Sequence, residues 1–432
     1  MTEHYRRGQG SLVSGTGWLL GNQALALALQ TASFLLLAQA LGVTEFGRLA
    51  AITALITIAT PIATWGYEGI LFRRAAREPG ALPQALGQAV VAALLVGTAT
   101  AIGLMILSSV LLPATLPPLV IAALCVAELV FGRISFLFGV AFRVTERYSA
   151  TLVCTLIAQT LRLLAALALY YSGPAANAAT WAAFTLLLSL ASVLVPLVLY
   201  FRAGSGIILS IKGLSTGIPE GGYFTLSGLS RTICAHADKA LLARESSASI
   251  MGSYAAASRL IDVAMQPLLA LAAASYGRFF RSGSTGIGSS HELALRLLPF
   301  SIGYGALAGV SLVLLAPYAT PLLGPGFETV AEMAIWLAPL PLLRGLQYQA
   351  GGALTGAGHQ HRRALLQLAS AAFSVVLCIV LIPRFSWRGA ASAAVLTDLL
   401  LSATLWFMLI SLYRRGRADP GLGQTKLTSD DC

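Results

Sequence analysis

Long apolar segments recur along the chain, and short segments rich in charged residues, Gly or Pro separate them. Each apolar segment has about 20 residues or more, enough for an α-helix to cross the roughly 30 Å hydrocarbon layer of a membrane. The pattern therefore predicts an all-α membrane protein with about twelve transmembrane helices. Their expected ranges are 16–41, 47–70, 85–111, 116–141, 149–171, 177–201, 222–244, 249–275, 294–316, 327–350, 364–383 and 388–413.

The composition indicates a protein that is embedded in the membrane over most of its length. Of the 432 residues, 57% are hydrophobic and 10% are charged, and the mean hydropathy is +0.78. Soluble domains carry roughly 25% charged residues, so a soluble domain with a single anchor is excluded. The first apolar segment, 17–40, is longer than the core of a signal peptide, which has about 7–15 residues. We expect it to remain as the first helix.

The distribution of lysine and arginine predicts which way the helices face. Eighteen of the 28 basic residues fall in the two termini and in links on one side of the predicted spans, whereas the opposite side has only Arg48, Arg244, Arg384 and Arg388. Basic residues that flank membrane helices are retained in the cytoplasm, so both termini are expected there. This topogenic use also accounts for the net charge of +11, and we expect no nucleic-acid partner.

The links divide the predicted helices into two halves. A long link rich in Gly and Ser, at about 202–221, separates the first six helices from the last six. This division predicts an N-terminal six-helix lobe at 1–205, a cytoplasmic connector at 206–221, a C-terminal six-helix lobe at 222–413 and a cytoplasmic tail at 414–432.

A short internal repeat supports this division. Leu37–Ile56 (LAQALGVTEFGRLAAITALI) aligns without a gap to Leu242–Ile261 (LARESSASIMGSYAAASRLI), with seven identical positions of twenty, among them Gly47 and Gly252. Six predicted spans separate the two copies, an even number, so the copies have the same orientation in the membrane. Two like-oriented halves around a central cavity form a recurring transporter architecture.

Ionisable residues occur within the predicted spans, where a charge costs about 2.5 kcal/mol or more and usually faces other helices or a water-filled cavity. The basic ones are Arg133, Arg162, Arg231, Lys239, Arg259 and Arg344, and the acidic ones are Glu128, Asp238, Asp262 and Asp398. One interpretation is structural: acids and bases form local pairs that hold helices together. The other interpretation is a cavity that receives a charged ligand.

Helical spacing separates the two interpretations for some of these residues. Arg259 and Asp262 are three residues apart and can pair on one helix. Arg162 and Arg344, in contrast, have no acidic neighbour on their own helices. Arginines without a local partner favour an aqueous cavity with an anionic ligand, because the guanidinium fork matches phosphate oxygens and keeps its charge when partly dehydrated.

We therefore predict a cationic substrate cavity and a separate gate or ion-coupling group. The predicted cavity residues are Arg133, Arg162, Arg231, Arg259 and Arg344. The predicted gate or ion-coupling residues are Asp238, Lys239, Asp262, Glu128 and Asp398.

The sequence has no arrangement that is typical of an enzyme. Its five cysteines are isolated, and it contains no recognisable catalytic triad, metal cluster or ATP-binding loop. We expect no catalytic residue, no metal and no cofactor. Energy for transport would then come from an ion gradient (H⁺ or Na⁺) or from coupled assembly outside the membrane.

Five stretches carry a family resemblance, and in chain order they are LAQALGVTEFGRLA, GYEGILFRRAA, DKALLARESSASIMGSYAAASRLI, LLGPGFETVAEMAIWLAP and LIPRFSWRGAASAAVLTDLL. Over about residues 10–413 the chain resembles the polysaccharide flippases of the superfamily that also contains multidrug exporters and the peptidoglycan-precursor flippase. The resemblance implies two six-helix lobes around a central cavity that opens alternately to each side. Only Asp238, at the start of a D-x-x-L-L pattern, is carried over by motif matching.

The resemblance also implies a substrate and a setting. The expected substrate is an oligosaccharide on a polyprenyl diphosphate, turned from the inner to the outer leaflet of the bacterial cytoplasmic membrane for surface polysaccharide synthesis (lipopolysaccharide O-antigen or exopolysaccharide). Expected partners are membrane lipids, a polysaccharide polymerase and its chain-length machinery. Two alternatives stay open: an ion-coupled multidrug or small-molecule antiporter of the same superfamily, and a membrane-embedded polysaccharide polymerase or ligase, which the short external links disfavour.

Overall fold

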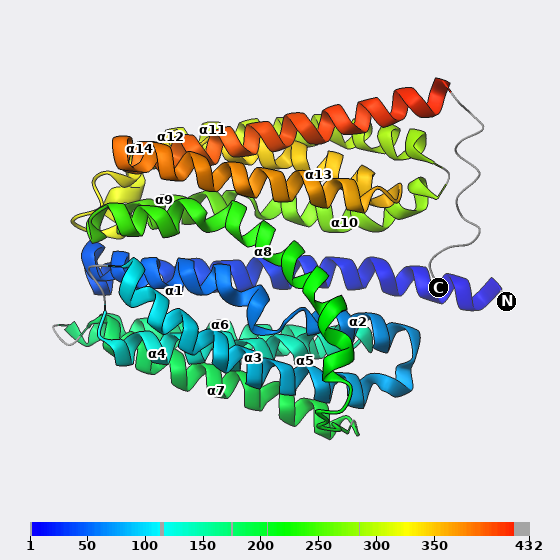
Figure 1. Cartoon of the computed structure of the whole chain (residues 1–432), viewed down its shortest axis with the longest axis horizontal. Helices are drawn as coiled ribbons and strands as arrows, with labels where there is room; N and C mark the ends of the chain where they lie inside the picture. Colours follow the sequence, from blue (N-terminus) through cyan, green and yellow to red (C-terminus); the bar gives the residue numbers. More distant parts are fainter. Residues whose placement is uncertain (1, 113–115, 174–175, 205, 285, 419–432) are drawn as a thin grey trace. The chain divides into compact units, whose positions relative to one another are not determined.

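A computed structural model of the chain describes residues 2–112, 116–173, 176–204, 206–284 and 286–418. Throughout these residues the regular secondary structure is helical (Figure 1). The predicted all-α fold class is confirmed.

The first half of the chain holds the helices α1 to α7 and two short irregular turns. In order they are α1 (Thr2–Ala63), α2 (Tyr67–Arg77), the 3-10 turn η1 (Pro79–Ala81), α3 (Leu82–Leu111), α4 (Pro118–Val126), the π-helical turn η2 (Ala127–Phe131), α5 (Gly132–Val144), α6 (Tyr148–Tyr171) and α7 (Ala178–Arg202). The π-helical turn lies between α4 and α5 and makes one continuous span of them.

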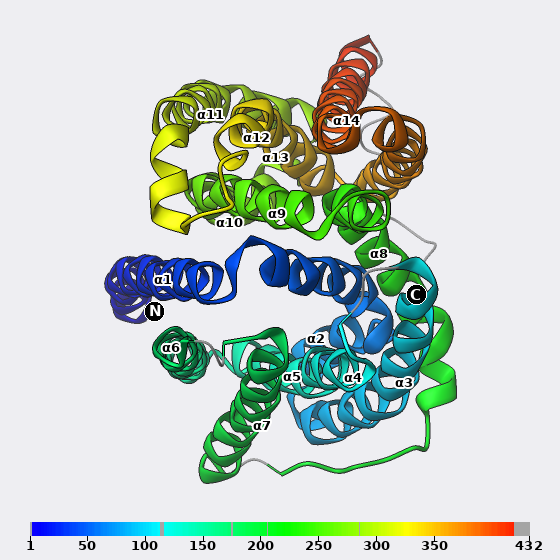
Figure 2. The same ribbon diagram turned by 90° about the vertical axis from the view of Figure 1, so that its left-hand side faces the viewer.

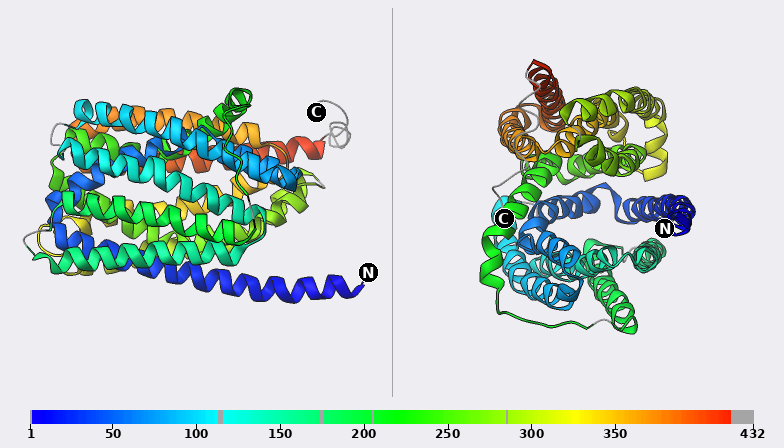
Figure 3. Two further views of the ribbon diagram at one scale, coloured as in Figure 1. Left: turned by 90° about the horizontal axis from the view of Figure 1, so that it is seen from below. Right: turned by 90° about the vertical axis from the view of Figure 1, so that its right-hand side faces the viewer.

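The second half of the chain holds the helices α8 to α14. In order they are α8 (Leu214–Glu245), α9 (Ala248–Ala264), α10 (Gln266–Gly283), α11 (Ile287–Leu323), α12 (Val330–Leu337), α13 (Leu340–Gly356) and α14 (Gln360–Ala418). An extended segment, 206–211, precedes α8 and is visible along the lower edge of the right-hand view in Figure 3.

All twelve predicted spans fall on these helices. Seven helices are long and apolar enough to cross a membrane, or eight if α9 and α10, bent by 44°, count as one span. α1 and α14 each hold two predicted spans, because Gly42 (φ 68°) and Ser386 (φ 50°) interrupt their helical geometry. α8 and the pair α12–α13 occupy the two remaining predicted ranges. The chain is a multi-pass membrane protein.

The helices form two compact units. The first comprises Met1–Thr232, Ser247–Gly252 and Leu322–Phe327, and the second comprises Ile233–Ser246, Ser253–Pro321 and Glu328–Cys432. α8 therefore begins in the first unit and ends in the second. The predicted connector, 206–221, is part of the first unit, and the predicted lobe boundaries stay a prediction.

The region after the second predicted span differs from the expected single helix at 47–70. α1 ends at Ala63, and a turn through Trp65 and Gly66 (φ 69°) leads into the separate helix α2. The backbone of Gly221 packs directly on Gly66, so a side chain at position 66 has no room. A glycine that adopts a left-handed φ breaks the helix here at little steric cost, although the apolar pattern continues.

α2 is an amphipathic helix that packs on the core of the first unit. Its buried face contributes Tyr67, Ile70 and Leu71, whereas Arg73 and Arg77 are exposed. The core around it is built from α2, α3, α5 and α7, whose helices are seen nearly end-on in Figure 2.

The core of the second unit joins α10, α11, α13 and α14. Its buried residues include Phe279, Ala350, Leu354 and Leu405. The indole N–H of Trp406 on α14 donates a hydrogen bond of 3.2 Å to the backbone carbonyl of Leu346 on α13. This close packing of α13 on α14 brings polar side chains of the two helices together.

Candidate functional site

The ten predicted site residues divide between the two compact units. The first unit contains Glu128, Arg133, Arg162 and Arg231, and the second contains Asp238, Lys239, Arg259, Asp262, Arg344 and Asp398. The two groups have different surroundings, and we describe each within its own unit.

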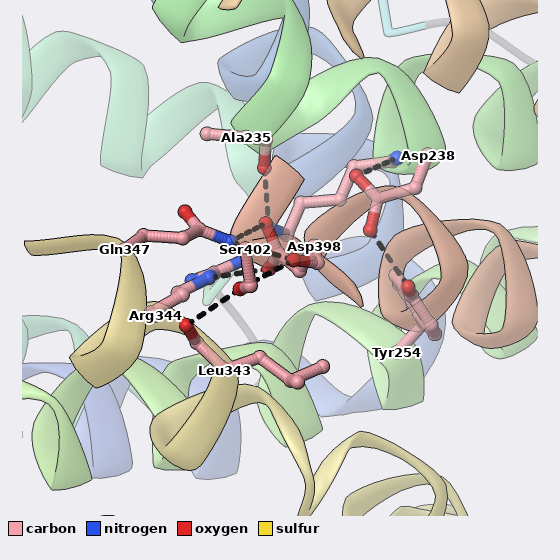
Figure 4. Close-up of polar contacts among 9 residues, drawn as sticks. Ala235, Asp238, Tyr254, Leu343, Arg344, Gln347, Asp398 and Ser402 are labelled. Atoms are coloured by element: carbon pink, nitrogen blue, oxygen red, sulfur yellow. Dashed lines mark hydrogen bonds and ion pairs between the residues drawn. The ribbon is translucent and has the colours of Figure 1, made fainter. Parts of the chain in front are cut away.

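An ion pair between α13 and α14 is the centre of the second group (Figure 4). Arg344 Nε lies 2.8 Å from Asp398 Oδ2, and the two side chains are only 24% and 14% exposed. A charge-assisted hydrogen bond in such partly dehydrated surroundings is stronger than one in water. Arg344 has no acidic neighbour on its own helix, as the spacing indicated, and its partner comes from α14 instead. Asp398 lies 54 residues further along the chain, and the pairing depends on how the helices pack.

Neighbouring side chains hold Asp398 in place. The Gln347 amide donates to Asp398 Oδ1 at 3.1 Å and to its backbone carbonyl at 2.9 Å. The Ser402 hydroxyl donates to the same carbonyl at 2.7 Å and to the carbonyl of Leu343 at 2.9 Å. Arg344 and Gln347 are one turn apart on α13, so a single face of that helix carries both donors.

A second buried carboxylate lies on α8 and is bound by a tyrosine. Asp238 is 8% exposed, and its Oδ2 accepts a 2.7 Å hydrogen bond from the hydroxyl of Tyr254 on α9. Its Oδ1 accepts from the backbone N–H of Lys239 at 2.8 Å. The Lys239 ammonium turns away and donates to the carbonyl of Ala235 at 3.3 Å. Asp238 is therefore satisfied by neutral donors.

His236 and Asp262 connect the two carboxylate sites. The charges of Asp238, Lys239, Asp262 and Arg344 all act on His236. Asp262 also acts on Arg344 and on Tyr348. We call this set the intramembrane charge cluster, and its members are His236, Asp238, Lys239, Tyr254, Asp262, Arg344, Gln347, Tyr348 and Asp398. Arg259, three residues before Asp262 on α9, is half-buried and has an interaction partner.

The first unit places Arg133 directly after the π-helical turn. Its guanidinium carbon lies 5.1 Å from the centre of the Phe136 ring, and its Nε is buried with no hydrogen-bond partner among the described residues. Glu68 and Glu128 are the carboxylates whose charges act on it. A π-helical turn bonds residues five apart, which brings Glu128 and Arg133 onto one side of the span.

Arg162 lies on α6 and Arg231 on α8, both in the first unit. Both side chains are exposed, and neither forms an ion pair with a carboxylate in the described part of the chain. The guanidinium of Arg162 lies 6.0 Å from the ring centre of Trp181, a cation–π contact at the outer limit of its range.

Five residues near the predicted site were missed from the sequence. Gln347 and Tyr348 follow Arg344 in RGLQYQ, His236 lies two residues before Asp238, and Glu68 falls inside the predicted span 47–70. Each is a polar side chain within an apolar segment, and this pattern can be recognised in the sequence. Tyr254 was not recognisable, because only the packing of α8 on α9 shows that its hydroxyl meets Asp238.

Within the described residues, no group of three or more His, Cys, Asp or Glu side chains is arranged to hold a metal ion.

Comparison with known sequences identifies a family. The sequence matches the family described as "Polysaccharide biosynthesis protein" over residues 12–282. A search of curated protein sequences gives no match.

Comparison with solved structures identifies the fold. An inward-facing multidrug resistance MATE family transporter of the MOP superfamily has a TM-score of 0.73 at 14% identity, with 91% of this chain and 96% of that chain covered. An outward-facing structure of such a transporter has a TM-score of 0.63 at 14% identity, with 92% and 96% covered. A MOP superfamily transporter from Pyrococcus furiosus, described by the reverse polarity of its binding pocket, has a TM-score of 0.63 at 14% identity, with 92% and 94% covered. The fold is that of MOP-superfamily transporters.

Proposed function

The chain belongs to the polysaccharide biosynthesis protein family, and from that premise we propose that it is a lipid-linked oligosaccharide flippase. Its substrate would be an oligosaccharide on a polyprenyl diphosphate, moved from the inner to the outer leaflet of a bacterial cytoplasmic membrane. A polysaccharide polymerase with its chain-length machinery would use the product. The family and the fold of MOP-superfamily transporters support a transport role.

One observation supports the anionic cargo above all others: the three predicted cavity arginines of the first unit form no ion pair with a described carboxylate. Arg133 and Arg162 lie in helices that are long and apolar enough to cross a membrane, and Arg231 lies on α8. No carboxylate of the described residues forms an ion pair with any of the three. A charge in a span costs about 2.5 kcal/mol or more, which purely structural packing does not require. A diphosphate would supply the missing negative charge, and separated arginines would release it more readily than a closed cage.

The intramembrane charge cluster supports a role in ion coupling. Asp398 is occupied by Arg344, so a proton or Na⁺ that binds this carboxylate has to weaken the ion pair. Asp238 is bound by the neutral Tyr254 hydroxyl, which leaves its negative charge without a direct counter-ion. We propose that H⁺ or Na⁺ binding in this cluster shifts the hydrogen bonds between α13 and α14. Asp262, Glu128 and Lys239 remain candidate coupling residues.

A multidrug antiporter is the second candidate, because the MATE transporter of similar fold is a multidrug transporter. A cavity for cationic drugs needs unpaired acidic groups, whereas the exposed unpaired charges described above, at Arg162 and Arg231, are basic. This difference favours the flippase. A polymerase or ligase is disfavoured by the short links 112–117 and 172–177, which leave no room for a catalytic domain outside the membrane.

The proposed function is tested by deleting the gene and following lipid-linked glycans by leaflet. A flippase deletion should abolish surface polysaccharide and leave lipid-linked units inaccessible to an impermeant sugar-specific lectin or glycosidase in intact spheroplasts. A polymerase or ligase deletion should instead leave single units accessible from outside. Unchanged glycans together with raised sensitivity to cationic dyes would reject the flippase and support the antiporter.

A further inference from the structure

A basic pocket lies at the C-terminal end of α2. It has a volume of about 370 Å³, and its wall includes Arg73, Arg74, Arg77, Glu78 and Gln84 from α2, η1 and the start of α3. All of these residues belong to the first compact unit. The arginine distribution assigns this end of the helices to the cytoplasm.

Arg74 is held in a fixed orientation by a buried glutamine. Its Nη1 donates a 3.0 Å hydrogen bond to the side-chain oxygen of Gln88 on α3. Gln88 is 3% exposed, and its amide nitrogen donates to the backbone carbonyl of Lys212 at 2.8 Å. A 180° flip of the Gln88 side-chain amide would therefore break both hydrogen bonds. This arrangement orients the guanidinium of Arg74, whose remaining N–H groups are available to a ligand.

The charges around the pocket leave a positive excess. Arg73 forms an ion pair with Glu220 of α8, and Glu78 lies in the wall. Arg74 and Arg77 form no ion pair with a carboxylate of the described residues. They are three residues apart on one helix, so their guanidinium groups reach the same side. Two planar guanidinium groups in a small pocket can donate paired hydrogen bonds to the oxygens of a phosphate group.

Exposed apolar side chains lie on α2, which contributes to the pocket wall, and on the segment bonded to the start of α3. Phe72 lies next to the arginines on α2, and Ile208 and Leu209 lie on the extended segment before α8; all three are exposed. That segment is fastened to the start of α3, because Ile208 N–H donates to the carbonyl of Pro83 at 3.0 Å. Exposed apolar side chains beside basic ones are typical of the membrane–water interface, where headgroups lie next to acyl chains.

We propose that this pocket binds the phosphate group of an inner-leaflet lipid, with Arg74 and Arg77 as its ligands and with acyl chains against Phe72, Ile208 and Leu209. Phospholipids and polyprenyl diphosphates share the phosphate chemistry, so the inference does not depend on the proposed cargo. Lipid bound here would stabilise the packing of α2 and the segment 206–211 within the first unit.

Native mass spectrometry of the full-length protein in detergent tests the proposal. The probes are phosphatidylglycerol, a polyprenyl diphosphate and inorganic pyrophosphate, each titrated against wild type and the double variant Arg74→Gln/Arg77→Gln. Interfacial arginines each contribute roughly a fivefold gain in affinity for an anionic lipid, so the double variant should bind phosphatidylglycerol about 30-fold more weakly. Arg296→Gln, at an exposed arginine on α11, is the matched control and should bind like wild type.

A second variant shows whether weaker lipid binding by the double variant comes from loss of the site or from misfolding. Gln84→Glu changes an exposed side chain in the pocket wall and should also weaken lipid binding, by charge repulsion, while the melting temperature stays at the wild-type value. Tighter binding of polyprenyl diphosphate than of phosphatidylglycerol, lost in the same variants, would support the site and identify the cargo lipid as its ligand. Equal binding of lipid by wild type and both variants, or binding of pyrophosphate without any lipid, would overturn the proposal.

Discussion

Gly47 on α1 and Gly252 on α9 occupy equivalent positions of the internal repeat and pack against each other. A side-chain carbon on Gly47 would overlap the backbone of Ala248, and one on Gly252 would overlap the carbonyl of Val43. Val43 and Ala248 are themselves equivalent positions of the repeat, so the contact is reciprocal. Both segments belong to the first compact unit. The repeat found in the sequence therefore corresponds to a symmetric helix contact, on the side assigned to the exterior.

A cysteine pair tests whether this contact must open. The hydroxyl oxygens of Thr44 and Ser249 are 3.1 Å apart, a separation from which two cysteines can form a disulfide with small adjustments. We predict that Thr44→Cys/Ser249→Cys oxidises readily, stops polysaccharide export and regains export on reduction. Export is measured by surface-glycan staining, and oxidation by loss of maleimide labelling. Full export by the oxidised protein would mean that the contact stays closed during transport.

The Arg344–Asp398 ion pair makes a prediction about stability. Arg344→Leu or Asp398→Leu alone leaves a partly buried charge without its partner, which costs on the order of 3 kcal/mol. The double variant removes both charges and should be less destabilised than either single variant. Thermal unfolding in detergent measures the effect. The exposed pair Arg388–Glu332 in the same unit is the control, where the cost is about 1 kcal/mol or less.

Much of the fold was predictable from the sequence, and the partners within the site were not. The apolar segments predicted where the helices lie, because segment length against bilayer thickness is a local property. α2 was missed because the turn at Gly66 lies inside an apolar pattern and depends on close packing with Gly221. Arg344 was assigned to a site but not to its partner Asp398, since spacing along one helix is visible in a sequence and contact between helices is not.

The exposed positions of Arg162 and Arg231 allow a test of their role in transport. Arg162→Ala and Arg231→Ala remove no ion pair of the described residues, so the melting temperature and the membrane level should stay at wild-type values. Export should fall at least tenfold for each variant if the cargo phosphate loses one charge-assisted contact of about 1.5–3 kcal/mol. Surface glycan is quantified against Arg296→Ala, an exposed arginine outside the proposed path. Normal export by both variants would exclude them as cargo ligands.

The partial burial of His359 predicts how the stability of the fold depends on pH. It lies in the link between α13 and α14, where burial, with help from the charge of Arg362, lowers its pKa below the usual 6.5. The unfolded chain then binds the proton more tightly, so the stabilising contribution is complete above about pH 6.5 and is lost as the pH falls through the lower, folded-state value. His359→Asn should reduce the loss of melting temperature on acidification. His361→Asn, at the exposed histidine two residues further on, is the matched control.

The predicted topology is tested with single cysteines in a protein whose five natural cysteines are replaced by alanine. Ser247 and Gly286 are both exposed and lie in links on opposite sides. Ser247→Cys should react with an impermeant thiol reagent added to intact cells, whereas Gly286→Cys should react only after the membrane is opened. The reverse labelling would invert the assignment of the basic pocket to the cytoplasm.

The π-helical turn Ala127–Phe131 also determines where Arg133 points. An α-helix advances about 100° per residue, and a π-turn accommodates one extra residue without advancing the helix by that amount. A helical wheel drawn through residue 127 therefore misplaces every later side chain of that span. Because the turn absorbs one extra residue, deleting one residue of it would leave an ordinary helix in which Arg133 keeps its place near Glu68 and Glu128. Converting the turn to regular α-helix without a deletion would instead rotate Arg133 by about 100° toward another face.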